Sequence, residues 1–103
     1  MQKKIYFCIM NNVFNTTLKI DYRFDLKGST QGRKTDLPPG QVPDPTIALK
    51  DLDFLEQRQM FKVGNIAKEQ LMQVIRRDTK FFAQQQIIDY SLLVGVHERA
   101  SHP

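Results

Sequence analysis

The chain has 103 residues, of which 41% are hydrophobic and 25% charged, a balance typical of a globular domain rather than a disordered one. A chain of this length forms one small domain at most. Its formal net charge of +4 favours acidic partners such as nucleotides, anionic lipids or nucleic acid. No run approaches the roughly 20 apolar residues that a transmembrane helix requires, so we expect a soluble or peripheral protein.

The single cysteine, Cys8, has no second thiol with which to form an internal disulfide, which favours a reducing intracellular compartment. It lies between apolar neighbours, which predict that Cys8 packs in the core. His97 and His102 are far from Cys8 in the sequence, and the three do not form a metal-binding pattern.

Residues 4–26 predict a β-hairpin. Residues 4–14 are β-branched and aromatic with little polar alternation, the pattern of a strand buried on both faces. Residues 15–17 predict a turn, and residues 18–26 then alternate apolar and polar side chains, as a half-exposed strand does. We therefore expect the two strands to pair antiparallel.

Residues 28–46 predict a long loop, because three glycines and four prolines leave no room for a helix. A loop of this length in a compact domain is usually functional or disordered. Residues 47–55 then predict a short strand or turn, and residues 60–63 a further short strand.

Residues 65–86 predict an amphipathic helix of about five to six turns, for which Asn65 is a suitable N-cap. Residues 90–97 return to strand composition, with Gly95 as a bulge or a point of close approach. The predicted order gives an α+β fold, with an antiparallel sheet and one long amphipathic helix. The apolar positions of the helix share one face, at Leu71, Val74, Ile75, Phe81 and Phe82.

Asp78 falls on the apolar stripe of this helix, where an unpaired buried carboxylate is costly. Two interpretations remain open. Either another element supplies a partner for Asp78, or the edge of the helix leaves it in water.

Two short stretches combine side chains that suit phosphate chemistry. In residues 25–30, Asp-Leu-Lys-Gly-Ser-Thr, Gly28 permits a sharp turn directly after a strand, and Lys27 offers a positive point charge. In residues 88–95, Asp89 stands just before an aliphatic strand. The pattern alone leaves two alternatives, a phosphoryl-handling site or a salt-bridged turn.

Four blocks of the sequence resemble the phosphatidylinositol phosphate kinase family. They are residues 24–30 (FDLKGST), 49–54 (LKDLDF), 77–78 (RD) and 88–97 (IDYSLLVGVH). The blocks occur in the family's order and near its spacing, and the first and last are highly specific to it. The resemblance implies a partial lipid-kinase fold, similar to SAICAR synthase and protein kinases, that transfers the γ-phosphate of ATP to an inositol hydroxyl.

The resemblance also implies catalytic roles. Lys27 matches the family lysine that contacts the transferred phosphate, and Asp89 matches the catalytic aspartate that orients or deprotonates the attacking hydroxyl. If so, the two side chains converge across adjoining strands, although some sixty positions separate them in the sequence.

For the base of ATP, the resemblance implies a second group of residues. Asn11 and Asn12 match the interlobe segment that bonds the purine edge, and Phe14 offers it a flat face. Leu93 matches an aliphatic floor under the base.

The resemblance implies that residues 1–103 form the central part of a kinase core. The family's glycine-rich hairpin and ATP-binding lysine would precede residue 4, and its second metal-binding aspartate and lipid-selecting loop would follow residue 97. We therefore expect the ligand of Mg²⁺ to lie outside these residues, and the 103 residues alone to be inactive.

Residues 10–12, Met-Asn-Asn, resemble family members that phosphorylate the 5-hydroxyl of phosphatidylinositol 4-phosphate, whereas Phe14 points weakly to the 4-hydroxyl. The expected partners are ATP and a phosphoinositide, and the expected location is cytoplasmic, at the inner face of the plasma membrane.

A non-catalytic, degenerate kinase module is the alternative, binding a partner protein or an anionic membrane through its basic residues. Acidic residues interleave with these and dilute the patch. Nucleic acid is not expected as a partner, because most aromatic residues sit at core spacing. The basic residues concerned are Lys19, Arg23, Lys27, Arg33 and Lys34.

Overall fold

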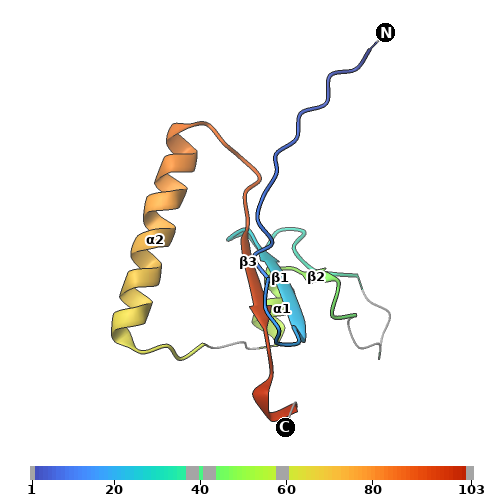
Figure 1. Cartoon of the computed structure of the whole chain (residues 1–103), viewed down its shortest axis with the longest axis vertical. Helices are drawn as coiled ribbons and strands as arrows, with labels where there is room; N and C mark the ends of the chain where they lie inside the picture. The colour runs from blue at the N-terminus through green and yellow to red at the C-terminus, as the bar shows by residue number, and fades with distance from the viewer. Residues whose placement is uncertain (1, 37–39, 41–43, 58–60, 102–103) are drawn as a thin grey trace.

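The computed structural model describes residues 2–36, 40, 44–57 and 61–101. These residues form a small three-stranded sheet with a short and a long helix (Figure 1), which confirms the predicted α+β class. The elements in chain order are β1 (Tyr22–Leu26), β2 (Ala48–Leu49), α1 (Asp51–Glu56), α2 (Asn65–Gln84), β3 (Leu92–Val96) and the 3₁₀ turn η1 (Arg99–Ser101).

The sheet has the order β2-β1-β3 and is mixed rather than wholly antiparallel. Phe24 in the middle of β1 lies opposite Val94 in the antiparallel partner β3 and opposite Leu49 in the parallel partner β2. The sheet is therefore antiparallel, as predicted, on one side of β1 only, and the antiparallel partner there is β3. The long loop after β1 makes the parallel pairing possible, because parallel neighbours need a long crossover connection.

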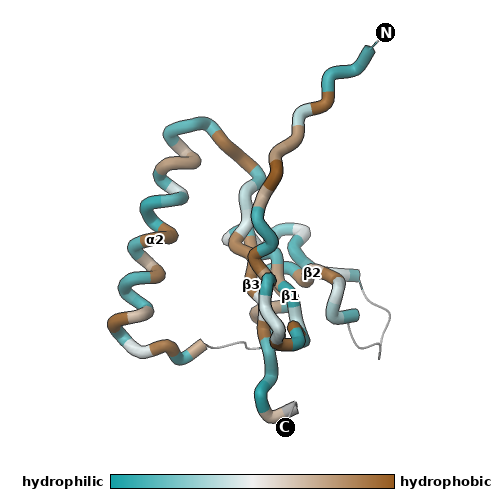
Figure 2. The backbone as a smooth tube through the Cα atoms, viewed as in Figure 1, coloured by the Kyte–Doolittle hydropathy of each residue, from teal (hydrophilic) through white to brown (hydrophobic). Residues whose placement is uncertain are grey.

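The predicted hairpin over residues 4–26 does not form. Residues 2–12 run as extended chain without a strand partner, and β1 begins only at Tyr22. A strand needs a hydrogen-bonded neighbour, and both edges of β1 are already occupied by β2 and β3. The apolar N-terminal segment (Figure 2) therefore stays exposed, and so does Cys8, for which core packing was predicted.

The core lies where β1, β2 and α1 meet. In the described part of the chain, Phe24 of β1 and Leu49 of β2 are the fully buried apolar side chains. Phe54 of α1 packs edge-to-face on Phe24, with ring centroids 5.1 Å apart. This contact packs α1 against the middle of β1.

The region predicted as a short strand or turn contains both a strand and a helix, β2 followed by α1. The helix begins with two aspartates, at Asp51 and Asp53, which is favourable because the N-terminus of a helix carries partial positive charge. Of the short strand predicted over residues 60–63, Met60 lies outside the described residues and residues 61–63 are not in a strand.

Helix α2 begins at Asn65, and its N-cap lies one residue before the predicted one. Gly64 is the N-cap, with φ of 81°, and its carbonyl accepts a hydrogen bond from the N–H of Lys68 at 3.0 Å. Asn65 is therefore the first helical residue and not the cap. The positive φ explains the glycine, because other residues are strained in that conformation.

The helix ends at Gln84, two residues before its predicted end. Its last turn closes with two hydrogen bonds, from the N–H of Gln86 to the carbonyl of Ala83 (3.1 Å) and from the N–H of Ile87 to the carbonyl of Phe82 (2.9 Å). With Gln86 in the left-handed region (φ 55°), this is a Schellman motif, which satisfies the terminal carbonyls and stops the helix.

Helix α2 stands beside the sheet, and none of its residues is buried. A cavity of about 580 Å³ separates its apolar face from the ends of β1 and β3. The ring of Phe82 stacks on Tyr90, with centroids 4.7 Å apart, and joins the end of the helix to the segment before β3. No helix among the described residues is long and apolar enough to cross a bilayer.

The carboxylate of Asp78 is 54% exposed and lies 3.5 Å from the guanidinium of its neighbour Arg77. The helix edge therefore leaves Asp78 in water, and its partner comes from the same helix rather than from another element.

Candidate active site

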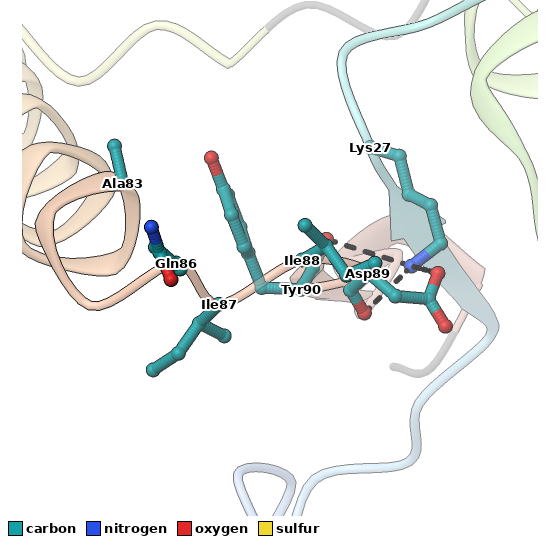
Figure 3. A pocket seen from close by; sticks show the side chains of 7 residues that line it. All are labelled: Lys27, Ala83, Gln86, Ile87, Ile88, Asp89 and Tyr90. Atoms are coloured by element: carbon teal, nitrogen blue, oxygen red, sulfur yellow. Dashed lines mark hydrogen bonds and ion pairs between the residues drawn. The ribbon is translucent and has the colours of Figure 1, made fainter.

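The predicted convergence of Lys27 and Asp89 is confirmed by the structure. Lys27 follows the last residue of β1, and its ammonium lies 3.0 Å from a carboxylate oxygen of Asp89 (Figure 3). The ammonium also donates hydrogen bonds to the carbonyl of Asp89 at 3.1 Å and to the hydroxyl of Ser91 at 2.8 Å. Lys27, whose ammonium contacts these oxygen atoms, borders an open pocket of about 770 Å³ at the end of α2.

The exposure of Asp89 leaves its carboxylate available to a substrate. Its backbone adopts φ of 63°, a left-handed conformation that aspartate tolerates better than most residues. Its side chain is 83% exposed, whereas that of Lys27 is 24% exposed. An ion pair with one partner so exposed contributes about 0–1 kcal/mol, so an incoming phosphate can compete for the ammonium.

The turn after Lys27 depends on Gly28. Its φ is 75°, and no heavy atom lies within 4 Å of the position that a Cβ would take. The glycine is therefore required by the backbone conformation and not by lack of space. The N–H groups of Lys27 and Gly28 both donate to the carboxylate of Asp51, at 3.2 and 3.0 Å.

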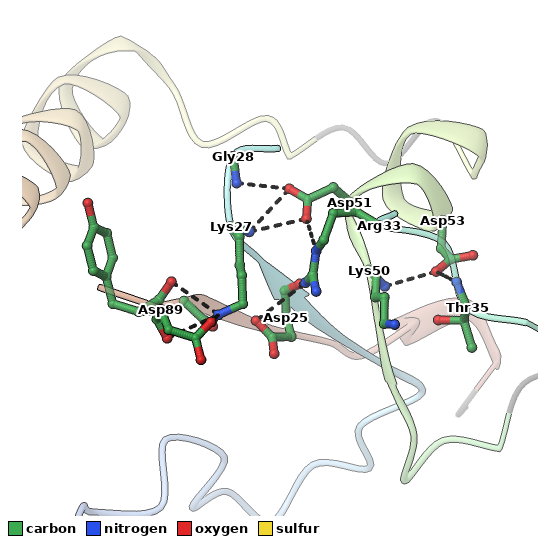
Figure 4. A network of polar contacts seen from close by, with 11 residues as sticks. Asp25, Lys27, Gly28, Arg33, Thr35, Lys50, Asp51, Asp53 and Asp89 are labelled. Carbon is green, nitrogen blue, oxygen red and sulfur yellow. Dashed lines mark hydrogen bonds and ion pairs between the residues drawn. The ribbon is translucent and has the colours of Figure 1, made fainter. Parts of the chain in front are cut away.

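Asp51 is the site residue that the sequence reasoning did not single out. It is the first residue of α1 (Figure 4), and the residue as a whole is only 8% exposed. Besides the two backbone N–H groups, it accepts a hydrogen bond from Nε of Arg33 at 3.0 Å. Burial, the largest influence, would raise the pKa of Asp51, but these hydrogen bonds outweigh it and lower the pKa below its ordinary value.

Asp53 performs a similar task two residues further along α1. Its carboxylate accepts hydrogen bonds from the N–H groups of Lys50 (2.9 Å) and Thr35 (3.0 Å). Burial would raise the pKa of Asp53, but the hydrogen bonds from Lys50 and Thr35, with the charge of Lys34, lower it overall. The two aspartates together tie the described start of the long loop to the first turn of α1.

Phe14 and Leu93, two residues predicted to flank the purine, lie on one face of the sheet. The ring of Phe14 covers Gly95, where a Cβ would come within 2.8 Å of two ring carbons. The predicted close approach at Gly95 is thus confirmed, and the guanidinium of Arg23 sits 4.8 Å from the centroid of the same ring. Leu93 is two residues before Gly95 in β3, which places its side chain on the same face.

The two asparagines predicted for the purine edge lie just before Phe14. The side-chain oxygen of Asn12 accepts a hydrogen bond from the N–H of Phe14 at 3.0 Å, which forms a local turn. Asn11 is exposed in the extended N-terminal segment.

A lysine ammonium and an exposed carboxylate that converge beside a pocket form a site suited to phosphoryl transfer. A family model described as phosphatidylinositol-4-phosphate 5-kinase matches residues 1–103. The chain therefore belongs to the phosphatidylinositol phosphate kinase family, as the resemblance of its motifs implied.

Curated relatives carry names from two branches of this family. The chain is 43% identical over 98 residues to phosphatidylinositol 4-phosphate 5-kinase of Plasmodium falciparum (isolate 3D7), covering 95% of this chain and 6% of that relative. It is 45% identical over 101 residues to phosphatidylinositol 4-phosphate 5-kinase 8 of Arabidopsis thaliana, covering 98% and 12%. It is 40% identical over 93 residues to human phosphatidylinositol 5-phosphate 4-kinase type-2 beta, covering 90% and 22%. The chain thus spans only a small part of these relatives.

The family implies ATP and a divalent metal as cofactors. The ammonium of Lys27, which is ringed by oxygen atoms and borders a pocket, fits a phosphate group of ATP. In the described parts of the chain, no group of three His, Cys, Asp or Glu side chains could hold a metal ion.

Proposed function

We propose that this chain carries the phosphate-transfer centre of a phosphatidylinositol phosphate kinase. In this centre Lys27 binds the transferred phosphate of ATP, and Asp89 orients the acceptor hydroxyl of the inositol ring. The observation that carries the proposal is the 3.0 Å contact between the Lys27 ammonium and the Asp89 carboxylate beside an open pocket. Phosphoryl transfer depends mainly on positioning and charge stabilisation, which such a pair supplies.

When bound, ATP supplies the phosphoryl group and Mg²⁺ neutralises its charge. The tasks of this chain are binding and orientation. Lys27 exchanges its contact with Asp89 for one with the phosphate. The released carboxylate then accepts a hydrogen bond from the attacking hydroxyl and holds it in line.

The base of ATP is proposed to lie against Phe14 and Leu93. Their common face of the sheet supports this role, because β1 leads along that face to Lys27. Asn11 and Asn12 lie close before Phe14 in the sequence and offer amide groups for the purine edge.

The proposed lipid substrate is a phosphatidylinositol monophosphate, and the 4-phosphate is the favoured isomer. The Met-Asn-Asn triplet of residues 10–12 and the names of the Plasmodium and Arabidopsis relatives support this choice. A lipid substrate is consistent with a cytoplasmic protein at the inner face of the plasma membrane. The 103 residues alone are proposed to be inactive, because the family resemblance implies a metal-binding aspartate outside them.

The alternative of a non-catalytic module that binds membranes through basic residues is less well supported. Four of the five basic side chains in question are already engaged within the chain, so they do not form an open cationic patch. Arg23 lies over Phe14, Lys27 pairs with Asp89, Arg33 pairs with Asp51, and Lys34 pairs with Glu56.

The test uses the full-length native protein that carries this sequence, with radiolabelled ATP, Mg²⁺ and phosphatidylcholine vesicles that contain phosphatidylinositol 4-phosphate or 5-phosphate. We expect phosphorylation of the 4-phosphate to be faster. Lys27→Ala is expected to lower kcat by about 10- to 150-fold, the range for one charge-assisted hydrogen bond.

Asp89→Asn keeps the shape of the side chain and its tolerance of positive φ, and should lower kcat at least as much as Lys27→Ala. Lys34→Met, which removes an exposed basic residue of the nearby loop, is the control and should leave kcat unchanged. Absence of lipid phosphorylation by the wild type would contradict the proposed function, and wild-type rates in both site variants would contradict the residue roles.

A further inference from the structure

Both the side-chain ammonium and the backbone N–H of Lys27 make hydrogen bonds, but only the ammonium takes part in the proposed chemistry. Its ammonium meets the segment from Asp89 to Ser91, whereas its backbone N–H donates to Asp51 in α1. The N–H of Gly28 donates to the same carboxylate. The carboxylate of Asp51 therefore fixes the turn from which the lysine side chain starts.

Arg33 connects this carboxylate to the end of β1. Its Nε donates to Asp51 at 3.0 Å, and its Nη2 donates to the backbone carbonyl of Asp25 at 2.6 Å (Figure 4). The Arg33 side chain is only 16% exposed and that of Asp51 only 11%, so water competes little for these bonds. One guanidinium thus links α1 to the strand residue two positions before Lys27.

We propose that Arg33 and Asp51 are positioning residues for phosphoryl transfer, which clamp the Lys27–Gly28 turn so that the ammonium reaches the phosphate in one orientation. This inference rests on the proposed function of Lys27. A lysine side chain is a flexible four-carbon stem, so its aim depends on how firmly its backbone is held. A misplacement of about 1 Å at a catalytic group can cost about 100-fold in rate.

The geometry requires arginine rather than any positive charge. The guanidinium donates in two directions at once, to a side-chain carboxylate and to a backbone carbonyl. A lysine ammonium carries the same charge but lacks this planar fork. Arg33→Lys should therefore fail to restore the clamp.

The experiment compares Arg33→Met with Lys34→Met in the full-length native protein, assayed with ATP, Mg²⁺ and vesicles of phosphatidylcholine and phosphatidylinositol 4-phosphate. The two variants are matched, because adjacent basic residues are each paired with an acid of α1. We expect Arg33→Met to lower kcat by about 10- to 100-fold, with a smaller change in KM for ATP, and Lys34→Met to leave both unchanged.

A double-mutant cycle separates positioning from a merely structural role. If Arg33 acts through Lys27, Arg33→Met should lower kcat by less than about 2-fold in a Lys27→Ala background. A loss as large as in the wild type would overturn the inference, and so would full activity of Arg33→Lys or an equal loss in Lys34→Met. If Arg33→Met does not fold, Arg33→Lys takes its place in the cycle.

Amide hydrogen exchange tests the clamp without any turnover. The amides of Lys27 and Gly28 should exchange about 10-fold faster or more in Arg33→Met, and not in Lys34→Met, because the bonds to Asp51 loosen. If the wild type phosphorylates no lipid, the proposed function fails, and the exchange rates alone then decide the clamp. Unchanged exchange at both amides would overturn it in either case.

Discussion

The two sides of the proposed site differ in how much of their structure is buried and hydrogen-bonded. On one side, the end of β1 and the start of α1 share the buried core and a network of short hydrogen bonds around Asp51. On the other side, α2 has no buried residue and touches the site mainly through the stack of Phe82 on Tyr90. The side that presents Lys27 is firmly packed, whereas α2, which precedes Asp89 in the chain, has no buried contact with the rest and forms a loose side.

This difference between the two sides is consistent with the different roles proposed for Lys27 and Asp89. A residue that stabilises developing charge on the phosphate must already be in place, because preorganisation is what lowers the barrier. A residue that receives a lipid hydroxyl benefits from exposure, and the Asp89 carboxylate is 83% exposed. The comparison predicts that substitutions on the fixed side cost stability, whereas equivalent substitutions on α2 do not.

The largest expected effect comes from Asp51→Asn, matched with Asp78→Asn on α2. Removing the Asp51 charge leaves the largely buried Arg33 with only the Asp25 carboxylate, 3.8 Å away, as an acidic partner. It also weakens the hydrogen bonds from the N–H groups of Lys27 and Gly28, so the free energy of unfolding should fall by about 3 kcal/mol. Asp78 is 54% exposed, and its loss should change the same free energy by no more than about 0.5 kcal/mol. Urea denaturation of the native protein measures both. Equal losses in the two variants would abolish the distinction between a fixed and a loose side.

The sequence predicted the residues that meet in the site better than the network that holds them. The Lys27 and Asp89 motifs indicated a converging pair through their resemblance to a family, and the contact exists. Helix α2 was predicted from its apolar periodicity, because that pattern is local. Its ends were less predictable, because they depend on backbone conformation at Gly64 and Gln86.

The clamp escaped prediction because its contacts are not local. The partners of the Asp51 carboxylate lie 24, 23 and 18 positions earlier in the chain, and no periodicity connects them. The sequence offered two signals, an acidic residue at the start of an ordered segment, which many helices share, and its place in the family-like block of residues 49–54, which assigned no role to Asp51. The strand predicted over residues 4–14 was wrong for a related reason. An apolar pattern predicts a preference for burial, but it does not identify the partner strand.

Gly95→Ala should have a smaller effect, on the face of the sheet that is proposed to bind the purine. A methyl group there would come within 2.8 Å of the Phe14 ring and displace it. Loss of one aromatic contact with the base should weaken nucleotide binding by about 1 kcal/mol, roughly 5-fold in Kd. Titration of the native protein with a fluorescent ATP analogue measures this affinity.

The control for Gly95→Ala is the same substitution in a Phe14→Ala background, where it should have no further effect. If the two losses add in full, Gly95 acts on nucleotide binding by a route other than the position of the Phe14 ring.

The smallest expected effect is a gain on the loose side, from Gln86→Gly. Gln86 occupies the left-handed position of the Schellman motif at φ 55°, a conformation that costs a non-glycine residue about 1 kcal/mol. Glycine removes that strain, so the amide of Ile87, whose hydrogen bond closes the motif, should exchange more slowly by up to about 5-fold.

The matched control is Gln85→Gly, because Gln85 has an ordinary φ of −88° and glycine there should only add backbone freedom to the unfolded chain. Exchange at Ile87 should then be faster than in the wild type. The opposite signs at two adjacent glutamines follow from backbone conformation alone, because the substitution is the same at both. If both variants exchange faster, strain at Gln86 does not limit the stability of the end of α2, and the absence of buried contacts on α2 is the better explanation for exchange there.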